Sequence, residues 1–155
     1  MAVVLADLLE ENQVKLELVA ETRDQALREL VGLLRGPGKV SNAESFLGEV
    51  LAREAVRTTF LGHGAAFPHA RTTLVSELVL AIGRSGAGIP YGEKGERAHL
   101  IFLLGVPVRM ASDYLVCVGA LARLVSDGKT REALLQATTA AELIELLRKG
   151  SLVLE

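Results

Sequence analysis

The chain has 155 residues, of which half are hydrophobic, 4% are aromatic and none is Trp. This length suits one domain that buries roughly 70% of its unfolded-chain surface, so we expect a single domain over residues 1–155. A formal net charge of −2 and a pI near 6.0 give no global attraction to nucleic acids or anionic membranes. The single cysteine, Cys117, excludes an internal disulfide framework and favours a reducing compartment.

The N-terminal segment MAVVLADLLEEN lacks the basic start of a signal peptide and acquires acidic residues early. No apolar run in the sequence reaches the length of a membrane span. We therefore expect a cytoplasmic protein without direct membrane insertion.

The beginning of the chain predicts a strand followed by an amphipathic helix. Apolar and polar residues alternate over residues 14–18, which indicates a strand with one solvated face. Thr22 and Gln25 form a capping box at the start of a helix. That helix carries apolar residues at helical spacing, namely Leu27, Leu30, Val31 and Leu34.

A second helix is predicted after the Gly-Pro-Gly loop at residues 36–38. Ser41 and Glu44 form a second capping box, which opens this helix. Arg53 and Glu54 lie in its last turn or two. An arginine at this place has an ordinary interpretation, because a cation near a helix C-terminus interacts favourably with the helix dipole.

Three segments in the middle of the chain predict further strands. They cover residues 64–68, residues 78–82 and residues 99–104. The last of these is a near-continuous apolar run, which is typical of a central strand buried on both faces. Five glycines around Pro90 predict a loop between the second and third of these strands.

The remainder of the chain predicts helices. Ser112 or Asp113 caps the first, and the second covers roughly residues 129–137. The third opens with a capping box in residues 139–142 and is closed by Gly150.

Residues 151–155 predict an edge strand after the last helix. Strands and helices thus alternate with short connections, and no linker or internal repeat interrupts them. This order predicts an α/β protein with a single mixed β-sheet flanked by helices on both sides.

The stretch TTFLGHGAAFPHAR, residues 58–71, contains two of the three histidines and no acidic residue. Pro68 fixes its own backbone and lacks an N–H, so we expect it to end the strand at residues 64–68. His69 then lies on the loop that follows a buried strand. A neutral imidazole, with an unperturbed pKa of about 6.5, can act there as a nucleophile, a proton carrier or a metal ligand.

Two motifs together resemble the phosphorylation site of a known family. They are L-x-R-E, in Leu51, Arg53 and Glu54, and T-T-x-L-G-x-G-x-A-x-P-H-A, from Thr58 to Ala70. The sequence is similar here to the fructose/mannitol-type enzyme IIA domain of the bacterial phosphoenolpyruvate-dependent sugar phosphotransferase system. The resemblance extends in pattern from about residue 8 to residue 150 and implies the enzyme IIA fold.

The resemblance implies that His69 receives a phosphoryl group from the phosphocarrier HPr and passes it to an enzyme IIB domain. The chain would then be a transferase with a phosphohistidine intermediate and without a metal or cofactor. Arg53 matches the arginine of the family motif, which implies a forked contact with the phosphoryl oxygens. Thr58 and Thr59 match positions that could donate further hydrogen bonds to the phosphoryl group.

Tyr114 departs from the family pattern. The family commonly carries a second histidine at the start of the helix that follows the Val106-Pro107 turn, and counting from that turn places Tyr114 there. A tyrosine can donate a hydrogen bond to a phosphoryl oxygen but cannot supply the charge of an imidazolium. The substitution therefore bears on the rate and direction of transfer more than on the fold.

The other residues with chemical potential have structural interpretations. His63 lies between two glycines, His99 opens a buried strand, and Cys117 lies on an apolar helix, where a core thiol is the default. Glu54 suits a structural pair or cap better than a catalytic role. The three histidines lack metal-ligand spacing, and no carboxylate cluster accompanies them.

Two function classes stay open besides the phosphocarrier. One is a IIA-like regulatory module, akin to the nitrogen-related branch, which binds a partner protein according to its phosphorylation state. Tyr114 favours this alternative slightly, as does the absence of attached IIB or IIC segments in the sequence. The other is a hydrolase with His69 as base, for which no nucleophile or metal partner lies at a suitable spacing. Sugar specificity resides in the IIB and IIC partners.

Overall fold

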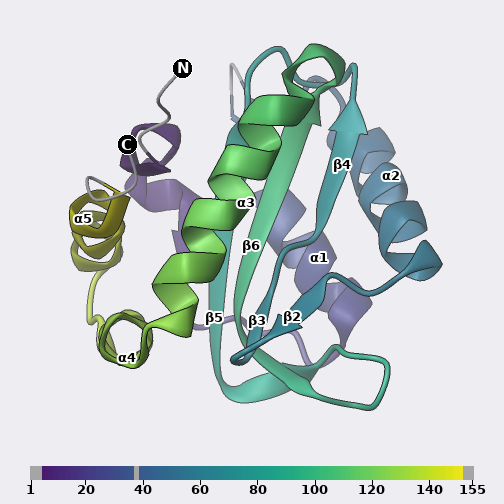
Figure 1. The fold of residues 1–155 in the computed structure, drawn as a ribbon. Helices are drawn as coiled ribbons and strands as arrows, with labels where there is room; N and C mark the ends of the chain where they lie inside the picture. Colours follow the sequence, from purple (N-terminus) through teal and green to yellow (C-terminus); the bar gives the residue numbers. More distant parts are fainter. Residues whose placement is uncertain (1–4, 37–38, 152–155) are drawn as a thin grey trace.

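A computed structural model describes residues 5–36 and 39–151 of the chain. The strands are β1 (Val14–Lys15), β2 (Phe60–Gly62), β3 (Ala65–Ala66), β4 (His69–Thr72), β5 (Val79–Pro90) and β6 (Arg97–Pro107). They form one mixed sheet in the order β1-β5-β6-β3-β2, and β4 also pairs with β6 (Figure 1). The prediction that the four expected strands share one sheet is confirmed, although β1 and β3 are shorter than expected.

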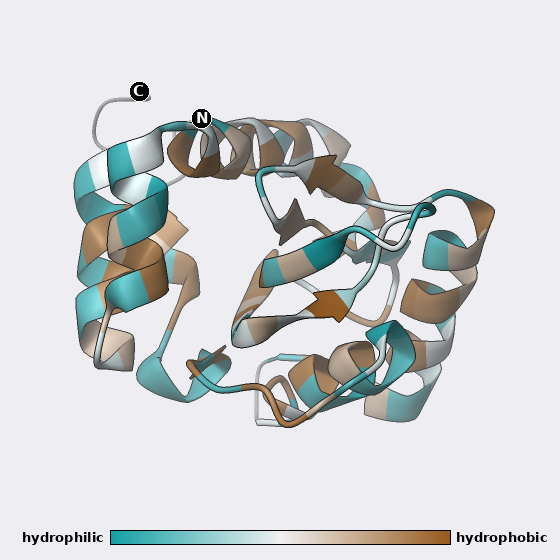
Figure 2. Cartoon of the chain, turned by 90° about the horizontal axis from the view of Figure 1, so that it is seen from below, coloured by the Kyte–Doolittle hydropathy of each residue, from teal (hydrophilic) through white to brown (hydrophobic). Residues whose placement is uncertain are grey.

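The helices lie on both sides of this sheet. They are α1 (Arg23–Gly32), α2 (Ala43–Val56), α3 (Ala111–Ser126), α4 (Gly128–Gln136) and α5 (Ala140–Ser151). Three short 3-10 segments accompany them, η1 (Leu5–Leu8), η2 (Glu11–Gln13) and η3 (Val108–Met110). In Figure 2 the strands occupy the centre of the view and the helices surround them, with hydrophobic and hydrophilic residues mixed along each helix.

Two hydrophobic cores explain this layering. Leu100, Phe102 and Leu104 of β6 pack in one core together with residues of α3, α4 and α5. Ile101 and Leu103 pack in the other core together with residues of α1 and α2. Because successive side chains of a strand point to opposite faces, a strand covered on both sides must be apolar at every position. The expectation of a central strand buried on both faces is confirmed.

The expected glycine-rich loop around Pro90 is wrong, because most of it belongs to β5. β5 and β6 pair antiparallel from Val79 opposite Gly105 to Arg84 opposite Leu100, and the pairing resumes after a bulge at Ile89 opposite Ala98. Gly88, at φ +81°, lies in this bulge. The glycines therefore serve a bulge within a long hairpin, which a composition rich in glycine does not distinguish from a loop.

The expected position of His69 on a loop is also wrong. His69 is the first residue of β4, which runs parallel to β6 from His69 opposite Leu104 to Thr72 opposite Pro107. β3 already ends at Ala66, two residues before Pro68. The Pro68 carbonyl accepts a hydrogen bond from the Leu104 N–H at 3.0 Å, so the chain stays extended along β6. His69 is consequently held by a sheet rather than by a loop.

The helix ends follow the capping predictions in part. The capping box of Thr22 and Gln25 is confirmed. The box of Ser41 and Glu44 is wrong: Asn42 is the N-cap of α2, because its side chain accepts a hydrogen bond from the Ser45 N–H at 3.0 Å. At the start of α5, half of the predicted box is formed: the Thr139 hydroxyl accepts a hydrogen bond from the Glu142 N–H at 3.0 Å, whereas the Glu142 carboxylate accepts the Thr138 N–H at 3.0 Å.

Two further helix-end predictions are wrong. α3 continues from η3 without a side-chain cap from Ser112 or Asp113, and its N-cap is Met110. α5 extends to Ser151, so Gly150 lies inside it rather than closing it. The predicted edge strand at residues 151–155 falls on the end of α5 and otherwise outside the described residues.

Candidate functional site

One surface pocket brings together all five candidate residues of the sequence. Its volume is about 380 Å³. It is lined by Arg53, Arg57, Thr58, Thr59, Phe60, Leu61, Phe67, His69, Glu93 and Tyr114. The walls come from the end of α2, the segment that leads into β2, the start of β4, the β5–β6 hairpin and the first turn of α3. Residues up to 61 positions apart in the chain thus meet around His69.

The ring of His69 is half-buried and has a defined orientation. Its Nδ1 lies 3.1 Å from the carbonyl oxygen of Phe67. A carbonyl oxygen only accepts hydrogen bonds, so we assign the proton of the neutral ring to Nδ1. This tautomer leaves the lone pair on Nε2, which makes Nε2 the nucleophilic atom.

Tyr114 lies directly against this ring. The two ring centroids are 4.6 Å apart at an interplanar angle of 38°. The Tyr114 hydroxyl lies 3.2 Å from Nδ1 and 3.3 Å from Nε2 of His69. Because Nδ1 carries the proton in the assigned tautomer, the hydroxyl donates to Nε2. The expected proximity of Tyr114 and His69 is therefore found.

The pKa of His69 is lowered from its ordinary value of 6.5. Burial is the largest cause, because it disfavours the charged ring, and the positive charge of Arg53 acts in the same direction. The hydrogen bond to Phe67 and the negative charge of Glu54 oppose the shift. The net effect keeps His69 neutral, and hence nucleophilic, at neutral pH.

The lowered pKa predicts a specific pH dependence of stability. The unfolded chain protonates His69 near pH 6.5, whereas the folded protein does so only at lower pH. Between these two pKa values, the unfolded state binds more protons than the folded state. The free energy of unfolding therefore decreases as the pH falls through 6.5. An NMR titration of the ring should give a midpoint below 6.5, and His69→Gln should remove this part of the pH dependence of unfolding. A midpoint at or above 6.5 would contradict the assignment of a neutral, partly desolvated ring.

Arg53 extends from the last turn of α2 into the pocket. Its Nη1 donates a hydrogen bond to the carbonyl oxygen of Arg57 at 2.9 Å. This bond gives a carbonyl group at the helix end a hydrogen-bond donor. Within residues 5–36 and 39–151, no carboxylate forms an ion pair with Arg53. Its remaining donors and its charge are thus available to an anion in the pocket.

The two threonines of the motif have different partners. Thr59 is 6% exposed and donates its N–H and its hydroxyl to the two carboxylate oxygens of Glu54, each at 2.6 Å. The Thr58 hydroxyl oxygen accepts a hydrogen bond from the Phe60 N–H at 3.2 Å, which leaves its own hydrogen free to donate into the pocket. Thr58 is consequently the better candidate donor to a bound anion.

The sequence reasoning missed two charged residues of the pocket, Arg57 and Glu93. Arg57 directly precedes Thr58, and its charge beside the motif was an available signal. Glu93 lies in the turn of the β5–β6 hairpin, and no local pattern connects it to His69. Only the tertiary fold brings this carboxylate to the pocket.

Comparison with known proteins identifies the family. The model of the family described as "Phosphoenolpyruvate-dependent sugar phosphotransferase system, EIIA 2" matches residues 7–150. The chain belongs to this family. The fructose-specific EIIA component of Haloferax volcanii is 32% identical over 135 residues, which are 86% of this chain and 88% of that protein. The fructose-specific EIIABC component of Bacillus subtilis is 27% identical over 94% of this chain. The matched region is only 23% of the length of that relative.

Solved structures confirm the enzyme IIA fold. The nitrogen regulatory protein IIA-Ntr of Neisseria meningitidis has a TM-score of 0.82 at 24% identity. The superposition covers 94% of this chain and 99% of that protein's chain. The mannitol IIA of Escherichia coli has a TM-score of 0.77 at 23% identity, and the superposition covers 90% of this chain and 98% of that protein's chain. The predicted α/β fold with a mixed sheet and helices on both sides is therefore confirmed, and the chain is a phosphotransfer component of the sugar phosphotransferase system.

The other histidines of this enzyme IIA chain lie outside the pocket. His63 is exposed at φ +52°, and its Nδ1 lies 3.3 Å from Nη1 of Arg131. His99 lies within β6, and its Nδ1 donates to the Ser85 carbonyl oxygen at 3.0 Å, as expected of a structural histidine. Cys117 is fully buried in the core, and burial raises the pKa of its thiol to about 11. These contacts agree with the structural interpretations made from the sequence.

In residues 5–36 and 39–151, no group of three or more His, Cys, Asp or Glu could hold a metal ion. None of the described helices has the length and apolar character needed to cross a membrane.

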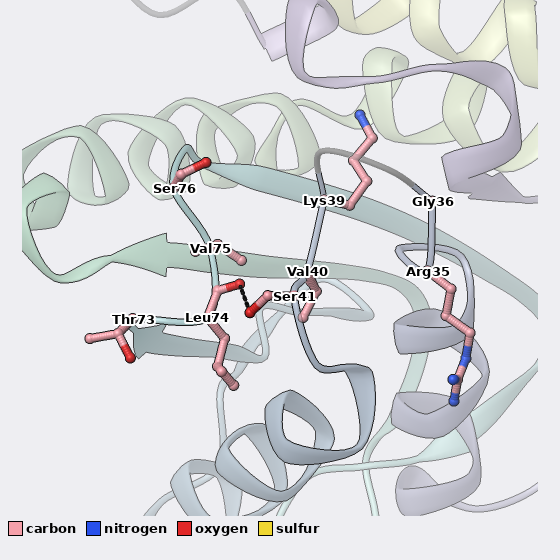
Figure 3. A pocket seen from close by; sticks show the side chains of 9 residues that line it. All are labelled: Arg35, Gly36, Lys39, Val40, Ser41, Thr73, Leu74, Val75 and Ser76. Atoms are coloured by element: carbon pink, nitrogen blue, oxygen red, sulfur yellow. Dashed lines mark hydrogen bonds between the residues drawn. The ribbon is translucent and has the colours of Figure 1, made fainter.

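A second cavity, of about 590 Å³, lies beyond the other end of β4 (Figure 3). Thr73 and Leu74, which directly follow β4, form one wall, and Ser41 donates its hydroxyl to the Leu74 carbonyl oxygen at 3.1 Å. Its Arg35 is paired with Glu44 at 3.2 Å. The described lining of this cavity contains no histidine or cysteine, so it offers no nucleophile comparable to His69.

Proposed function

We propose that this enzyme IIA domain, comprising residues 1–155, accepts a phosphoryl group on His69 from an HPr-type phosphocarrier and passes it to a IIB domain. The observation that carries the proposal is that a neutral His69, whose Nδ1 is bonded to the Phe67 carbonyl, lines the same pocket as Arg53. Family membership supports it, as does the complex of the E. coli mannitol IIA with phosphorylated IIB, whose IIA has a TM-score of 0.80 at 22% identity to this chain.

The bonds and charges of the transfer step balance without a metal or cofactor. The lone pair of His69 Nε2 attacks the phosphorus atom, and the P–N bond to the donor imidazole breaks with its electron pair returning to that ring. The His69 ring then carries positive charge, which the Nδ1–H bond to the Phe67 carbonyl stabilises. Because a P–N bond is exchanged for a P–N bond, the domain contributes positioning and charge stabilisation rather than bond activation.

The pocket residues have separate roles in this step. Arg53 pairs with the phosphoryl oxygens, which carry about −1.5 to −2 charges in ester analogues. Thr58 donates a hydroxyl hydrogen to the same oxygens. Tyr114, whose hydroxyl donates to Nε2 before transfer, shifts this bond to a phosphoryl oxygen once Nε2 is occupied. Arg57 adds a second positive charge to the pocket wall.

We expect Tyr114→His to raise the rate of phosphoryl transfer. An imidazolium at this position adds charge next to the incoming phosphoryl group, whereas the tyrosine supplies only a hydrogen bond. Rates of phosphoryl uptake from phosphorylated HPr, measured by rapid quench at pH 6 and pH 8, should show the larger gain at pH 6, where the new histidine is charged. A Tyr114→His rate equal to or below that of the parent at both pH values would contradict this role.

A regulatory module is the second candidate function. The observation that favours it is Tyr114, which stands where the family commonly has a histidine. The likeness to IIA-Ntr of N. meningitidis is compatible with either function, because at 24% identity it concerns the fold alone. In this alternative, the phosphorylation state of His69 controls the binding of a partner protein.

One reconstitution distinguishes the two candidates. The protein is incubated in cytoplasm-like buffer with phosphoenolpyruvate, enzyme I and HPr, and then mixed with fructose-type and mannitol-type IIB domains. The carrier proposal expects one acid-labile phosphoryl group per chain, followed by its transfer to a IIB domain. Labelling without onward transfer to any IIB would favour regulation. Failure of every HPr to label the chain would refute both.

A further inference from the structure

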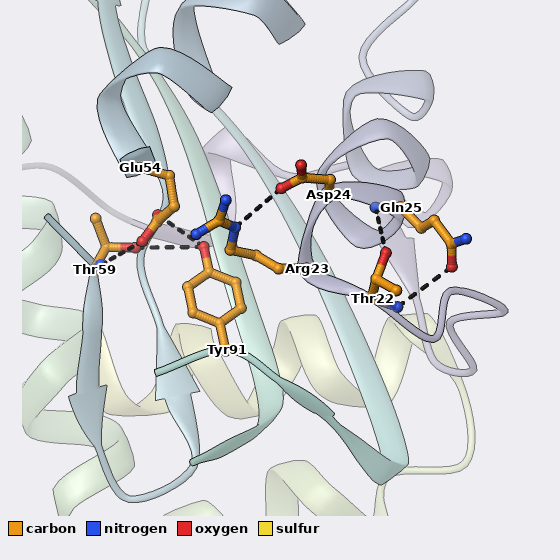
Figure 4. A network of polar contacts seen from close by, with 7 residues as sticks. All are labelled: Thr22, Arg23, Asp24, Gln25, Glu54, Thr59 and Tyr91. Carbon is orange, nitrogen blue, oxygen red and sulfur yellow. Dashed lines mark hydrogen bonds and ion pairs between the residues drawn. The ribbon is translucent and has the colours of Figure 1, made fainter. Parts of the chain in front are cut away.

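A buried polar network adjoins the His69 pocket and is drawn in Figure 4. Its members are Glu54, Thr59 and Tyr91, which are 2%, 6% and 4% exposed. One oxygen of the Glu54 carboxylate accepts the Thr59 N–H, and the other accepts the hydroxyls of Thr59 at 2.6 Å and Tyr91 at 2.9 Å. A buried carboxylate is costly unless its oxygens are hydrogen-bonded, and these three bonds meet that requirement.

Two members of the network, Glu54 and Thr59, are next to a pocket residue in the chain. Glu54 follows Arg53 on α2, and neighbours on a helix point about 100° apart, so one can face the interior while the other enters the pocket. Thr59 follows Thr58, and both residues line the pocket. The three segments that the carboxylate joins are therefore three segments that form the pocket wall.

The third segment is the β5–β6 hairpin. Tyr91 is the first residue of its turn, and its N–H and that of Gly92 donate to the Glu96 carbonyl oxygen at 2.9 and 3.1 Å. The Glu96 carboxylate also accepts the Lys94 N–H at 2.9 Å. These bonds hold the turn that begins at Tyr91 in one compact conformation. Glu93, which lines the His69 pocket, lies in this turn.

We propose that Glu54 and Tyr91 are positioning residues for phosphoryl transfer. Their buried hydrogen bonds tie the end of α2, the Thr58–Thr59 segment and the β5–β6 hairpin together, and so hold the pocket wall around His69. The inference rests on the proposed function of the pocket. Neither residue lines the pocket, so both act through pocket residues of the segments that they join, Arg53 for Glu54 and Glu93 for Tyr91.

Charge adds a second connection between this network and His69. The negative charge of Glu54 raises the pKa of His69, in opposition to burial and to Arg53. Arg23, at the start of α1, extends toward Tyr91 in Figure 4 and supplies a positive charge near the network. Glu54 therefore affects His69 both by position and by charge, whereas Tyr91 affects it by position alone.

The test uses Tyr91→Phe, which removes one hydroxyl and keeps the ring. Thr72→Val is the matched control, because Thr72 is 3% exposed and its hydroxyl accepts the Leu74 N–H at 3.1 Å at the other end of β4. We expect Tyr91→Phe to slow phosphoryl uptake from HPr about tenfold, since small misplacements of positioning groups are costly. Thr72→Val should leave uptake unchanged. Equal rates for Tyr91→Phe and the parent would overturn the proposal.

Two physical measurements make the result independent of the transfer assay. In Tyr91→Phe, amide exchange at Lys94 and Gly95 should become about fivefold faster, as expected for the loss of one buried hydrogen bond, and the NMR signal of the Arg53 Nε–H should shift. In Glu54→Gln, the midpoint of the His69 titration should decrease further. If HPr fails to label even the parent, the proposed function fails, and unchanged exchange and Arg53 signals in Tyr91→Phe would separately overturn the positioning role.

Discussion

Replacing His69 by Ala is expected to abolish phosphorylation of this enzyme IIA domain, whereas His63→Ala and His99→Ala should leave it intact. Of the three histidines, only His69 lines the pocket that contains Arg53, and its Nε2 carries the lone pair that can attack phosphorus once the Tyr114 hydroxyl moves away. The readout is acid-labile phosphate per chain after incubation with phosphoenolpyruvate, enzyme I and HPr.

The two control variants separate loss of the nucleophile from loss of the fold. His99 is the stricter control, because its ring donates to the Ser85 carbonyl and its loss perturbs the sheet. Circular dichroism should show all three variants folded. Phosphate retained on His69→Ala, at a level near that of the parent, would assign the acceptor to another residue.

Arg53→Ala is expected to slow phosphoryl transfer by roughly 10-fold to 100-fold. A charge-assisted hydrogen bond is worth about 1.5–3 kcal/mol, and the mutation removes it from the transferring group. The free energy of unfolding should change by less than about 1 kcal/mol, because the one hydrogen bond that Arg53 makes within the described residues, to the Arg57 carbonyl, lies at an exposed helix end. Single-turnover uptake from phosphorylated HPr measures the first effect, and urea unfolding measures the second.

Arg109→Ala is the matched control for Arg53→Ala. Arg109 also donates to a backbone carbonyl, that of Ser76 at 2.9 Å, and its removal changes the net charge equally. It does not line the His69 pocket. If both variants lost transfer to the same extent, the effect would come from net charge in the encounter with HPr, and Arg53 would act as a helix-end cation only.

The parts of the fold that depend on local patterns could be predicted from the sequence. The continuous apolar run at residues 99–104 identified the strand covered on both faces, and the Thr22–Gln25 box identified the start of α1. The β5 bulge at Gly88 and the strand status of His69 could not be predicted this way. Both depend on pairing with β6, which is a long-range interaction. The glycines and the proline in these segments are, by local pattern alone, typical of loops.

The site shows the same division between local and long-range information. The motif and the spacing from Val106-Pro107 placed Arg53, His69 and Tyr114 correctly around one pocket. Thr58 and Thr59 looked equivalent, but burial of Glu54 commits the second to that carboxylate. Tyr91 and Glu93 reach the pocket region through the hairpin, so their contribution became visible only in three dimensions.

The most direct test of the central claim is to locate the P–N bond in the phosphorylated parent protein. After incubation with phosphoenolpyruvate, enzyme I and HPr, two-dimensional NMR can correlate the phosphorus with the ring hydrogens and nitrogens of the histidine that carries it. We expect one phosphohistidine, at His69, with the phosphorus bonded to Nε2 and the Nδ1–H still donating to the Phe67 carbonyl. Phosphorus on Nδ1 of His69, on another residue or on none would contradict it.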